Sequence, residues 1–293
     1  MIEDVVPQLS CPHCATALSL SSGRLTCETG HTFDVARQGY VSLLRGDHRA
    51  GTADTAPMVE ARAAFLAEGH YAGIADLASR LARSAVEALG EEPTSACIVD
   101  LGAGTGYYLA RVLDTVGELR PDMPGIALDV SKFAARRAAR AHPRIGSVVA
   151  DAWQSLPIRG RAASVVLNIF APRNAVEMRR ILHPDGRAVV IAPEPGHLAE
   201  LIDAYGLMSV DERKRERIAA QFEGRFAVES EHEWRSTMRL TAAQAGALVD
   251  MGPNAWHAAT RAAPGSSEQE AGAGTADQMD VTAAVRAYVL RPS

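Results

Sequence analysis

The sequence has no long hydrophobic run and no strong excess of one charge. No stretch of about 18 apolar residues occurs, which excludes a membrane-spanning helix of ordinary length. Residues 1–4 are Met-Ile-Glu-Asp and lack the cationic and apolar regions of an export signal, so we expect a cytoplasmic protein. A net charge of −5 does not favour a nucleic-acid partner. With 293 residues and 47% hydrophobic content, the chain has material for one large domain or two moderate ones.

The cationic residues are unevenly distributed. Residues 132–187 contain eleven Lys and Arg but only three acids. Such a stretch can face the phosphates of RNA. It is equally explained by solvated helix surface in an arginine-rich composition, and charge alone favours this second interpretation.

Cysteine is scarce, and its placement is informative. Three of the four cysteines lie in the first 27 residues, as Cys11-x2-Cys14-x12-Cys27-x3-His31. Two close pairs of ligands separated by about a dozen residues are typical of a tetrahedral zinc site. The alternative, buried or disulfide-bonded cysteines, is disfavoured in the cytosol. Because four protein ligands leave no open position for substrate, we predict one structural zinc ion.

A dinucleotide-binding fingerprint is absent, although a glycine-rich turn is present. The pattern G-x-G-x-x-G would need glycine where the chain has Tyr107. The chain has instead Asp100-x-Gly102-x-Gly104-x-Gly106, between a β-branched run and a helix-compatible segment. A strand, a tight turn and a helix open a doubly wound α/β sheet, and glycines let the backbone pass close to a ligand.

Two further predicted strands also end in acids. Residues 125–129 end in Asp129, and residues 147–151 end in Asp151, which Ala152 follows. One explanation is that these acids only cap the helices that follow. The set also resembles class I S-adenosylmethionine (SAM) methyltransferases, and the resemblance implies that Asp129 bonds the ribose hydroxyls and that Asp151 and Ala152 face the adenine. That resemblance implies an α/β, Rossmann-like fold with a seven-stranded, mostly parallel sheet, here carrying a small N-terminal zinc-binding module.

The chain divides into three predicted parts: residues 1–50 as a zinc-binding, RNA-recognising module, 51–95 as connecting helices and 96–293 as the methyltransferase domain. Within the connecting helices, the polar residues Arg62, His70 and Tyr71 cluster where two helices should meet. Residues 225–239 have the alternation of a strand pair, and residues 282–290 predict a last strand. Residues 262–276 have no large apolar residue and are predicted to be a mobile loop.

The order of these motifs resembles one family, the bacterial 23S rRNA guanine-N1 methyltransferases. The resemblance extends from Cys11 to about Leu201 and includes Cys-Pro-His-Cys, Gly-Tyr-Val-Ser-Leu-Leu and Pro-Gly-His-Leu. It implies zinc and SAM as cofactors and N1 of one guanine as substrate, in a 23S rRNA hairpin near the peptide exit tunnel. It also implies a homodimer, and one branch of the family is linked to macrolide resistance. The cofactor contacts that it implies fall on Tyr71, Gly106, Tyr107 and His197.

The acceptor side of the site is predicted after the strand at residues 163–170. Asn168 could bond the guanine edge, Phe170 could stack on the base, and Arg173 could take a phosphate or O6. The alternative is that Asn168 and Phe170 only finish a strand and pack. An N6-adenine methyltransferase would carry Asn/Asp-Pro-Pro-aromatic here, which is absent. No unambiguous general base is present, so Asn168 is the one catalytic candidate.

The predicted RNA contacts of the zinc module lie in its single cationic segment. Residues 1–50 hold four arginines against five acids, and Arg45 and Arg49 lie together near the end. Three other functions compete with rRNA methylation. They are methylation of a small molecule with zinc only bracing the fold, a SAM-fold binding protein without catalysis, and, least favoured, a nicotinamide enzyme. The cysteine motif argues against the first, and the complete acid and glycine set argues against the second.

Overall fold

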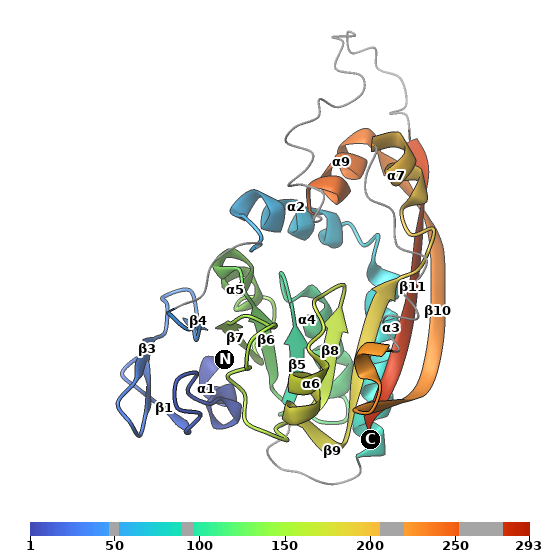
Figure 1. Ribbon diagram of the computed structural model, residues 1–293. Helices are drawn as coiled ribbons and strands as arrows, with labels where there is room; N and C mark the ends of the chain where they lie inside the picture. The colour runs from blue at the N-terminus through green and yellow to red at the C-terminus, as the bar shows by residue number, and fades with distance from the viewer. Residues whose placement is uncertain (47–52, 90–96, 206–219, 252–277) are drawn as a thin grey trace.

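The structure is a computed structural model that describes residues 1–46, 53–89, 97–205, 220–251 and 278–293. In this part of the chain a large sheet has eight strands in the order β10-β11-β9-β8-β5-β6-β7-β4. Its centre comprises β5 (Cys97–Leu101), β6 (Gly125–Asp129), β7 (Ile145–Val149), β8 (Ala163–Ile169) and β9 (Leu182–Pro193), which are all parallel. The long strands β10 (Phe226–Thr241) and β11 (Gln278–Pro292) extend it in antiparallel fashion. This is the predicted Rossmann-like sheet (Figure 1).

Helices cover both faces of this sheet. The strands β5 and β8 are buried along their whole length, as continuous apolar runs such as Cys97-Ile-Val predict for central parallel strands. One face packs against α3 (Ala72–Ala88), α4 (Tyr107–Gly117) and α5 (Lys132–Ala138). The other packs against α1 (Ile2–Val5), the 3-10 turn η1 (Val6–Gln8) and α6 (Ala175–Ile181). The apolar side chains thus form two cores, one on each face of the sheet.

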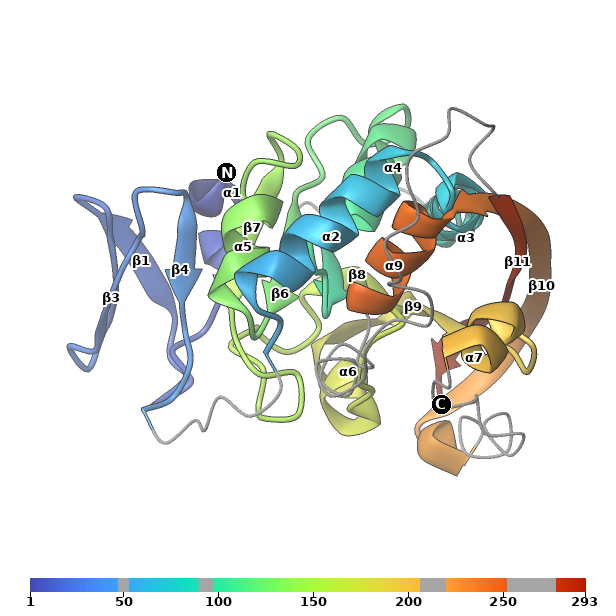
Figure 2. The same ribbon diagram turned by 90° about the horizontal axis from the view of Figure 1, so that it is seen from above.

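A roof of two helices lies over the carboxyl ends of the parallel strands. Helix α2 (Ala56–Ala67) begins at Thr55, whose hydroxyl caps it by accepting from Met58 N–H, and packs against α9 (Ala242–Asp250). Seen from above, α2 crosses the tops of the strands with α9 beside it (Figure 2). Near α9, α7 (Ala199–Tyr205) packs on β11. Among the described helices, none is long and apolar enough to cross a membrane.

The zinc module forms a small antiparallel sheet of β1 (Leu18–Ser21), β2 (Arg24–Cys27) and β3 (Thr32–Asp34). The chain then enters the large sheet, because β4 (Tyr40–Ser42) pairs in parallel with β7. This strand brings the described large sheet to eight strands instead of the predicted seven. It is short, and its sequence lacks the long apolar run by which buried strands are found. The boundaries predicted at residues 50 and 95 lie in segments that the structure does not describe, and the division into domains stays a prediction.

At the edge of the large sheet opposite β4, the structure differs from the strand pair predicted at residues 225–239. Residues 225–239 do not form a strand pair but one strand, β10, which pairs along its length with β11. The alternation in the sequence is that of an edge strand with one exposed side. Side chains alternate every second residue in one long strand just as they do in two shorter ones, so the pattern does not distinguish them. The predicted last strand at residues 282–290 is confirmed within β11. The predicted loop at 262–276 lies outside the described residues.

Candidate functional site

The four predicted zinc ligands converge. The ligand atoms of Cys11, Cys14, Cys27 and His31 all lie within 4.8 Å of one another. The Sγ atoms of Cys14 and Cys27 are 3.7 Å apart, and His31 Nδ1 is 3.6 Å from Cys11 Sγ and 3.4 Å from Cys27 Sγ. A tetrahedron with zinc–sulfur bonds of about 2.3 Å and a zinc–nitrogen bond of about 2.0 Å has sulfur–sulfur edges of about 3.8 Å and sulfur–nitrogen edges of about 3.5 Å. The donors therefore fit zinc in number, type and spacing.

Neighbouring hydroxyl groups favour the ligand form of one cysteine. The Sγ atom of Cys14 lies 3.1 Å from the hydroxyl of Thr16 and 3.1 Å from that of Thr29. These hydrogen bonds lower the pKa of Cys14 to about 5. Because the thiolate and not the thiol binds metal, the site holds this ligand ready for zinc near neutral pH.

The predicted cofactor loop lies at the switch point of the large sheet. β5 has β6 on one side and β8 on the other, so the crevice at its carboxyl end is open, and this is where doubly wound folds bind ligands. The loop turns through Gly102, Gly104 and Gly106, all with positive φ. A Cβ on Gly102 would lie 2.5 Å from Ala171 Cβ, and one on Gly106 would lie 3.0 Å from Ala138 Cα. The glycines therefore let this turn pass between α5 and the loop after β8.

Two buried carboxylates flank the turn. Asp129 accepts from Gly104 N–H at 2.9 Å and from Ser131 N–H at 2.8 Å, while burial raises its pKa. Asp100 is almost completely buried, and its Oδ2 has no protein partner. Burial, followed by the charge of Asp129, raises the pKa of Asp100 to about 7. A buried carboxyl oxygen without a protein donor beside a glycine cradle fits a ligand that brings its own donors, as the amino and hydroxyl groups of SAM do. Asp100, Gly102, Gly104, Gly106 and Asp129 thus form one edge of the predicted SAM site.

Asp100 makes the free energy of unfolding decrease as the pH rises. Because its pKa is about 7 in the folded chain against the usual 3.8, the folded state keeps a proton that the unfolded state has released. The stabilisation is complete below about pH 4 and is lost as the pH rises through about 7. From this group we expect a free energy of unfolding that is about 2–3 kcal/mol smaller at pH 8 than at pH 5.

Urea unfolding of the wild type and of Asp100→Asn at both pH values measures this contribution. The variant should lack that part of the pH dependence, while any contribution of the zinc ribbon is common to both proteins. The same pH dependence in both proteins would contradict the assignment.

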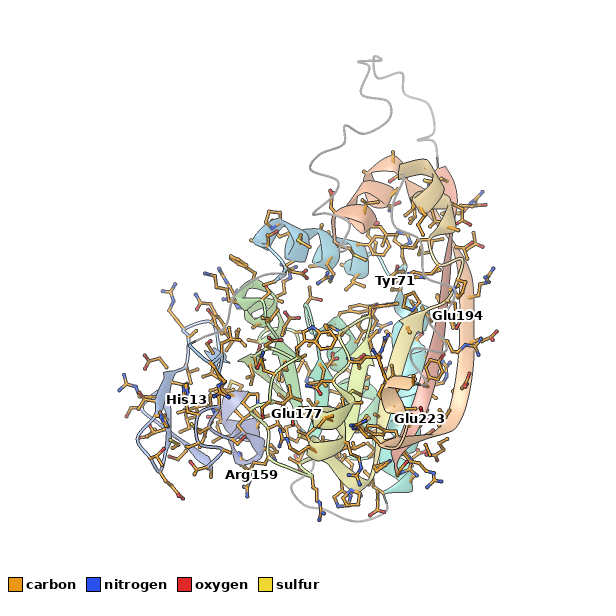
Figure 3. All side chains as sticks on the ribbon, viewed as in Figure 1. His13, Tyr71, Arg159, Glu177, Glu194 and Glu223 are labelled. Atoms are coloured by element: carbon orange, nitrogen blue, oxygen red, sulfur yellow. The ribbon has the colours of Figure 1, made fainter. Side chains whose placement is uncertain are left out.

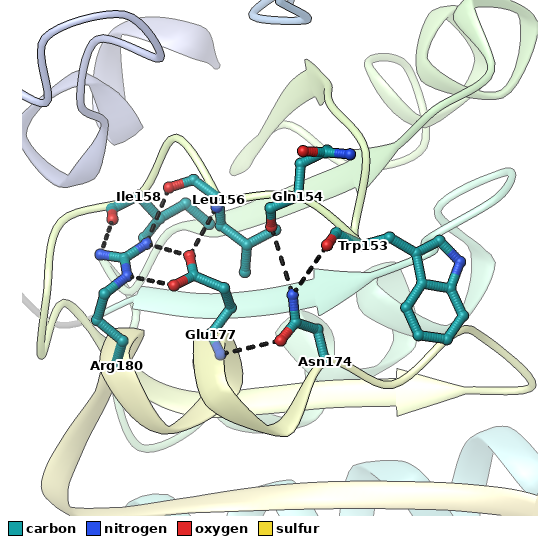
Figure 4. Close-up of polar contacts among 7 residues, drawn as sticks. All are labelled: Trp153, Gln154, Leu156, Ile158, Asn174, Glu177 and Arg180. Carbon is teal, nitrogen blue, oxygen red and sulfur yellow. Dashed lines mark hydrogen bonds and ion pairs between the residues drawn. The ribbon is translucent and has the colours of Figure 1, made fainter. Parts of the chain in front are cut away.

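The loop after β7 is fastened to α6 (Figure 4). Glu177 accepts from Leu156 N–H at 2.7 Å and is paired with Arg180, which also donates to the Leu156 and Ile158 carbonyls. Burial alone would raise the pKa of Glu177, but the Arg180 guanidinium and the Leu156 N–H hold it below its usual value. Asn174 donates to the carbonyl of Trp153 at 3.3 Å.

This anchoring fixes Asp151 and Ala152 at the site's edge. The Asp151 carboxylate accepts from Trp153 N–H at 2.9 Å, and Ala152 is buried. Their predicted contact with adenine is compatible with this position and stays a prediction.

An aromatic cluster forms beside the glycine turn from three residues far apart in sequence. Phe170, directly after β8, lies 5.7 Å from the His197 ring at an interplanar angle of 27° and 6.0 Å from the Tyr71 ring, centroid to centroid. His197 Nδ1 accepts from Ala284 N–H at 3.1 Å, so the neutral ring carries its proton on Nε2, 3.4 Å from the Tyr71 hydroxyl. Tyr71 is buried below the end of α2 (Figure 3). We call Tyr71, Phe170 and His197 the aromatic cluster.

Phe170 has an unusual backbone and a partly open ring. Its φ is +55°, a conformation that a bulky side chain rarely adopts, and its side chain is 37% exposed. Asn168, fully buried, donates through Nδ2 to the Pro172 carbonyl at 2.7 Å and so closes this turn. The Asn168 Oδ1 has no protein partner. Arg173 is half-buried, and burial lowers its pKa. The structure thus brings Phe170 to the site and makes Asn168 the residue that shapes its loop.

The remaining predicted residues lie at the start of α4 and beyond the site. Tyr107 is the first residue of α4, and its ring meets that of Tyr108 edge-on at 5.2 Å. Arg45 is exposed in the segment after β4, and Arg49 lies outside the described residues. In Figure 3, His13 of the zinc module lies well apart from Tyr71, so the two predicted centres are separate.

Sequence analysis did not find one contact of the glycine turn. Arg62 of α2 lies over Gly104 and is paired with Asp54, which precedes the helix. Arg62 stood out in sequence as a polar residue among apolar neighbours, but no spacing rule connects it with Asp54. The only local signal in the sequence is the start of its helix, which the Thr55 cap and the following proline predict. That signal places Arg62 on a helix but not next to Gly104.

Comparisons with known proteins agree with this geometry. A family model for the zinc ribbon described as "RlmA, N-terminal" matches residues 9–50. The chain is 51% identical to a 23S rRNA (guanine(748)-N(1))-methyltransferase of Streptomyces fradiae, over 88% of this chain and 89% of that relative. It is 43% identical over the full length of both chains to a Micromonospora griseorubida protein named "Putative 23S rRNA (guanine-N(1)-)-methyltransferase". The solved MccD protein matches 73% of this chain and 96% of its own at 13% identity with a TM-score of 0.46.

These findings confirm the resemblance seen in the sequence. The ribbon at the N-terminus is a zinc ribbon, and the chain is an S-adenosylmethionine-dependent methyltransferase. Together with near-complete coverage at 51% and 43% identity, they show that the chain belongs to the family of 23S rRNA (guanine-N1)-methyltransferases.

Proposed function

We propose that this protein transfers the methyl group of SAM to N1 of a single guanine in 23S rRNA, in a hairpin near the peptide exit tunnel. The Streptomyces fradiae relative's name gives the guanine as 748, and we propose the same position here. Such a substrate places the enzyme in the cytoplasm. The observation that carries the proposal is Phe170, a half-open aromatic ring held in a left-handed conformation beside the cofactor edge.

A planar base needs a flat surface next to the methyl donor. A guanine inside an RNA hairpin must be unstacked before its N1 is reachable, and aromatic side chains replace the lost stacking. The aromatic cluster offers that surface, because Phe170 is backed by the His197 and Tyr71 rings at 5.7 and 6.0 Å. Left-handed backbone at a bulky residue is costly and is typically retained at functional sites. Asn168 would hold this turn in place through Pro172.

Alignment is the main task of the protein in this reaction. SAM supplies an already activated methyl group, so holding N1 in line with it accounts for most of the required rate increase. We propose that Asp129 holds the ribose, that Asp151 and Ala152 face the adenine, and that Tyr71, Gly106, Tyr107 and His197 line the methionine end. Since His197 Nδ1 is used by Ala284, the ring holds Tyr71 and is not free to take the N1 proton.

The zinc ribbon is the proposed reader of the surrounding RNA. Arg45 is one of its exposed arginines, with Arg24 and Arg37, and follows the strand that joins the ribbon to the large sheet. We predict that Arg45→Glu weakens binding of a 23S rRNA hairpin about three- to tenfold and leaves SAM affinity unchanged, because phosphate contacts act mainly through charge. Filter binding at two salt concentrations and calorimetry with SAM measure the two effects. Unchanged RNA affinity with a lowered SAM affinity would contradict the prediction.

Methyl transfer from labelled SAM to protein-free 23S rRNA, followed by primer extension, tests the function. A methyl on guanine N1 blocks the Watson–Crick edge, so reverse transcriptase should stop at one new position. Methylation of several sites would contradict a single target guanine, and no methylation by a protein that binds SAM and zinc would favour a small-molecule acceptor. The same preparation tests two further proposals, a homodimer by light scattering and macrolide resistance by tylosin tolerance of a host that expresses the protein.

A further inference from the structure

We propose that Arg62 binds the α-carboxylate of SAM and so selects the intact amino-acid end of the cofactor; this rests on the proposed function. An ideal Cβ on Gly104 would lie 3.5 Å from Arg62 Nη1 and 3.7 Å from its Cδ. The guanidinium therefore covers the very glycine whose missing side chain leaves room for a ligand. A ligand that lies on the Cβ side of Gly104 therefore comes within reach of Arg62.

The same glycine links Arg62 to the ribose acid. Gly104 N–H donates to Asp129 at 2.9 Å, so Arg62, Gly104 and Asp129 lie within the length of one SAM molecule. Burial raises the pKa of Asp129, and the nearby Arg62 guanidinium acts in the opposite direction. Arg62 reaches this position from the roof, because its helix α2 crosses above the carboxyl ends of the strands (Figure 2).

Acidic side chains surround the turn. Asp100 and Asp129 flank it, and Asp54 lies beside it. These acids suit the sulfonium and the amino group of SAM but repel its one negative group, the α-carboxylate. Guanidinium matches a carboxylate in shape and charge, and pairing is strengthened where water is partly excluded. The Arg62 side chain is 24% exposed and that of Asp54 is 20% exposed, so this pair is mostly shielded.

The present partners of Arg62 are compatible with a ligand. Arg62 donates to the Asp54 carboxylate through Nη1 and to the Met251 carbonyl through Nη2. A guanidinium has five N–H groups, so these two bonds leave donors for a ligand carboxylate. The competing explanation is that Arg62 only ties the linker before α2 to the end of α9. The two explanations differ in one measurable respect, since a purely structural tie does not distinguish ligands by their carboxylate.

The experiment compares SAM with decarboxylated SAM, which lacks only the α-carboxylate, by calorimetry of the full-length zinc-loaded protein. For the wild type we expect SAM to bind about 10- to 100-fold more tightly than the analogue. In Arg62→Gln this ratio should fall to about one, with affinity for the analogue unchanged. Arg62→Lys, which keeps the charge but not the fork, should give an intermediate ratio and provides the result if the glutamine variant folds poorly. Arg80→Gln, on the exposed face of α3, is the matched control and should keep the wild-type ratio.

The outcomes separate the two levels of the proposal. An unchanged ratio in both Arg62 variants, or an equal loss of affinity for both ligands, would overturn the role of Arg62 while leaving SAM as the cofactor. Failure of the wild type to bind either ligand would overturn the proposed function itself.

Discussion

Replacing Cys27 with serine is expected to remove the zinc and abolish rRNA methylation, with a loss of activity of more than about hundredfold. A neutral hydroxyl is a poor zinc ligand, and structural zinc contributes on the order of 10 kcal/mol to small zinc modules. Cys27 is 5% exposed and belongs to the same apolar core as Leu9, Leu25 and Val41. The ribbon should therefore lose its order, and the large sheet should lose part of its edge packing.

Metal analysis and hydrogen exchange measure this effect. We expect zinc to fall from about one ion per chain to near none, and amide protection to disappear in β1 to β3 while it persists in β5 and β6. Cys97→Ala is the matched control, because Cys97 is buried in β5 and lies outside the ligand group. Full zinc content in Cys27→Ser would show that the four-ligand assignment is wrong.

Replacing Phe170 with alanine is expected to lower kcat/KM for 23S rRNA about 10- to 100-fold and to change SAM affinity less than about threefold. Stacking of a base on an aromatic ring contributes about 1–3 kcal/mol, or about 5- to 160-fold, and the expected loss lies within these limits. Phe170 is the most open ring of the aromatic cluster, since Tyr71 and His197 are buried. Its removal leaves a hole where the base should rest and does not touch Asp100 or Asp129.

The specificity of that effect needs two further variants. Phe170→Tyr keeps an aromatic face and should retain most activity. Leu119→Ala removes a side chain with the same 37% exposure, after α4 and away from the carboxyl ends of the strands, and should have no effect on methylation. An equal loss in the Leu119 and Phe170 variants would mean that general stability, and not base stacking, is being measured.

Much of the fold was predictable because its signals are local. The apolar run into Asp100 and the glycines after it define β5 and its turn. The strands that end at Asp129 and near Asp151 repeat the same pattern of an apolar run followed by an acid. The eight-stranded arrangement was not predictable, because β4 has three residues and pairs with a strand about 100 residues away. The single strand β10 was mistaken for two for a related reason, since alternation shows which side is buried but not where a strand ends.

The site divides in the same way. The zinc ligands could be found from spacing alone, since their geometry is built by two tight turns. The pairing of Tyr71 with His197 spans 126 positions, and that of Arg62 with Met251 spans 189. No pattern in one sequence encodes such pairings, because they arise only when segments far apart in the chain pack together at the carboxyl ends of the strands. The role of Phe170 was predictable from its place after a strand, but its left-handed backbone was not.

The pairing of β4 with β7 also sets an order of events during synthesis. The set of four zinc ligands is complete once residue 31 has emerged and can bind metal at that time, whereas β4 must wait for residues 145–149. At about 5–20 residues per second, this delay is roughly 5–20 s. During that interval the nascent chain carries a folded ribbon next to a strand with unpaired backbone groups, which other strands can capture. Slow translation through residues 43–149 would therefore favour pairing of β4 with a wrong strand. A ribbon that has already bound zinc reduces this risk, because fewer residues of the nascent chain are then left unfolded.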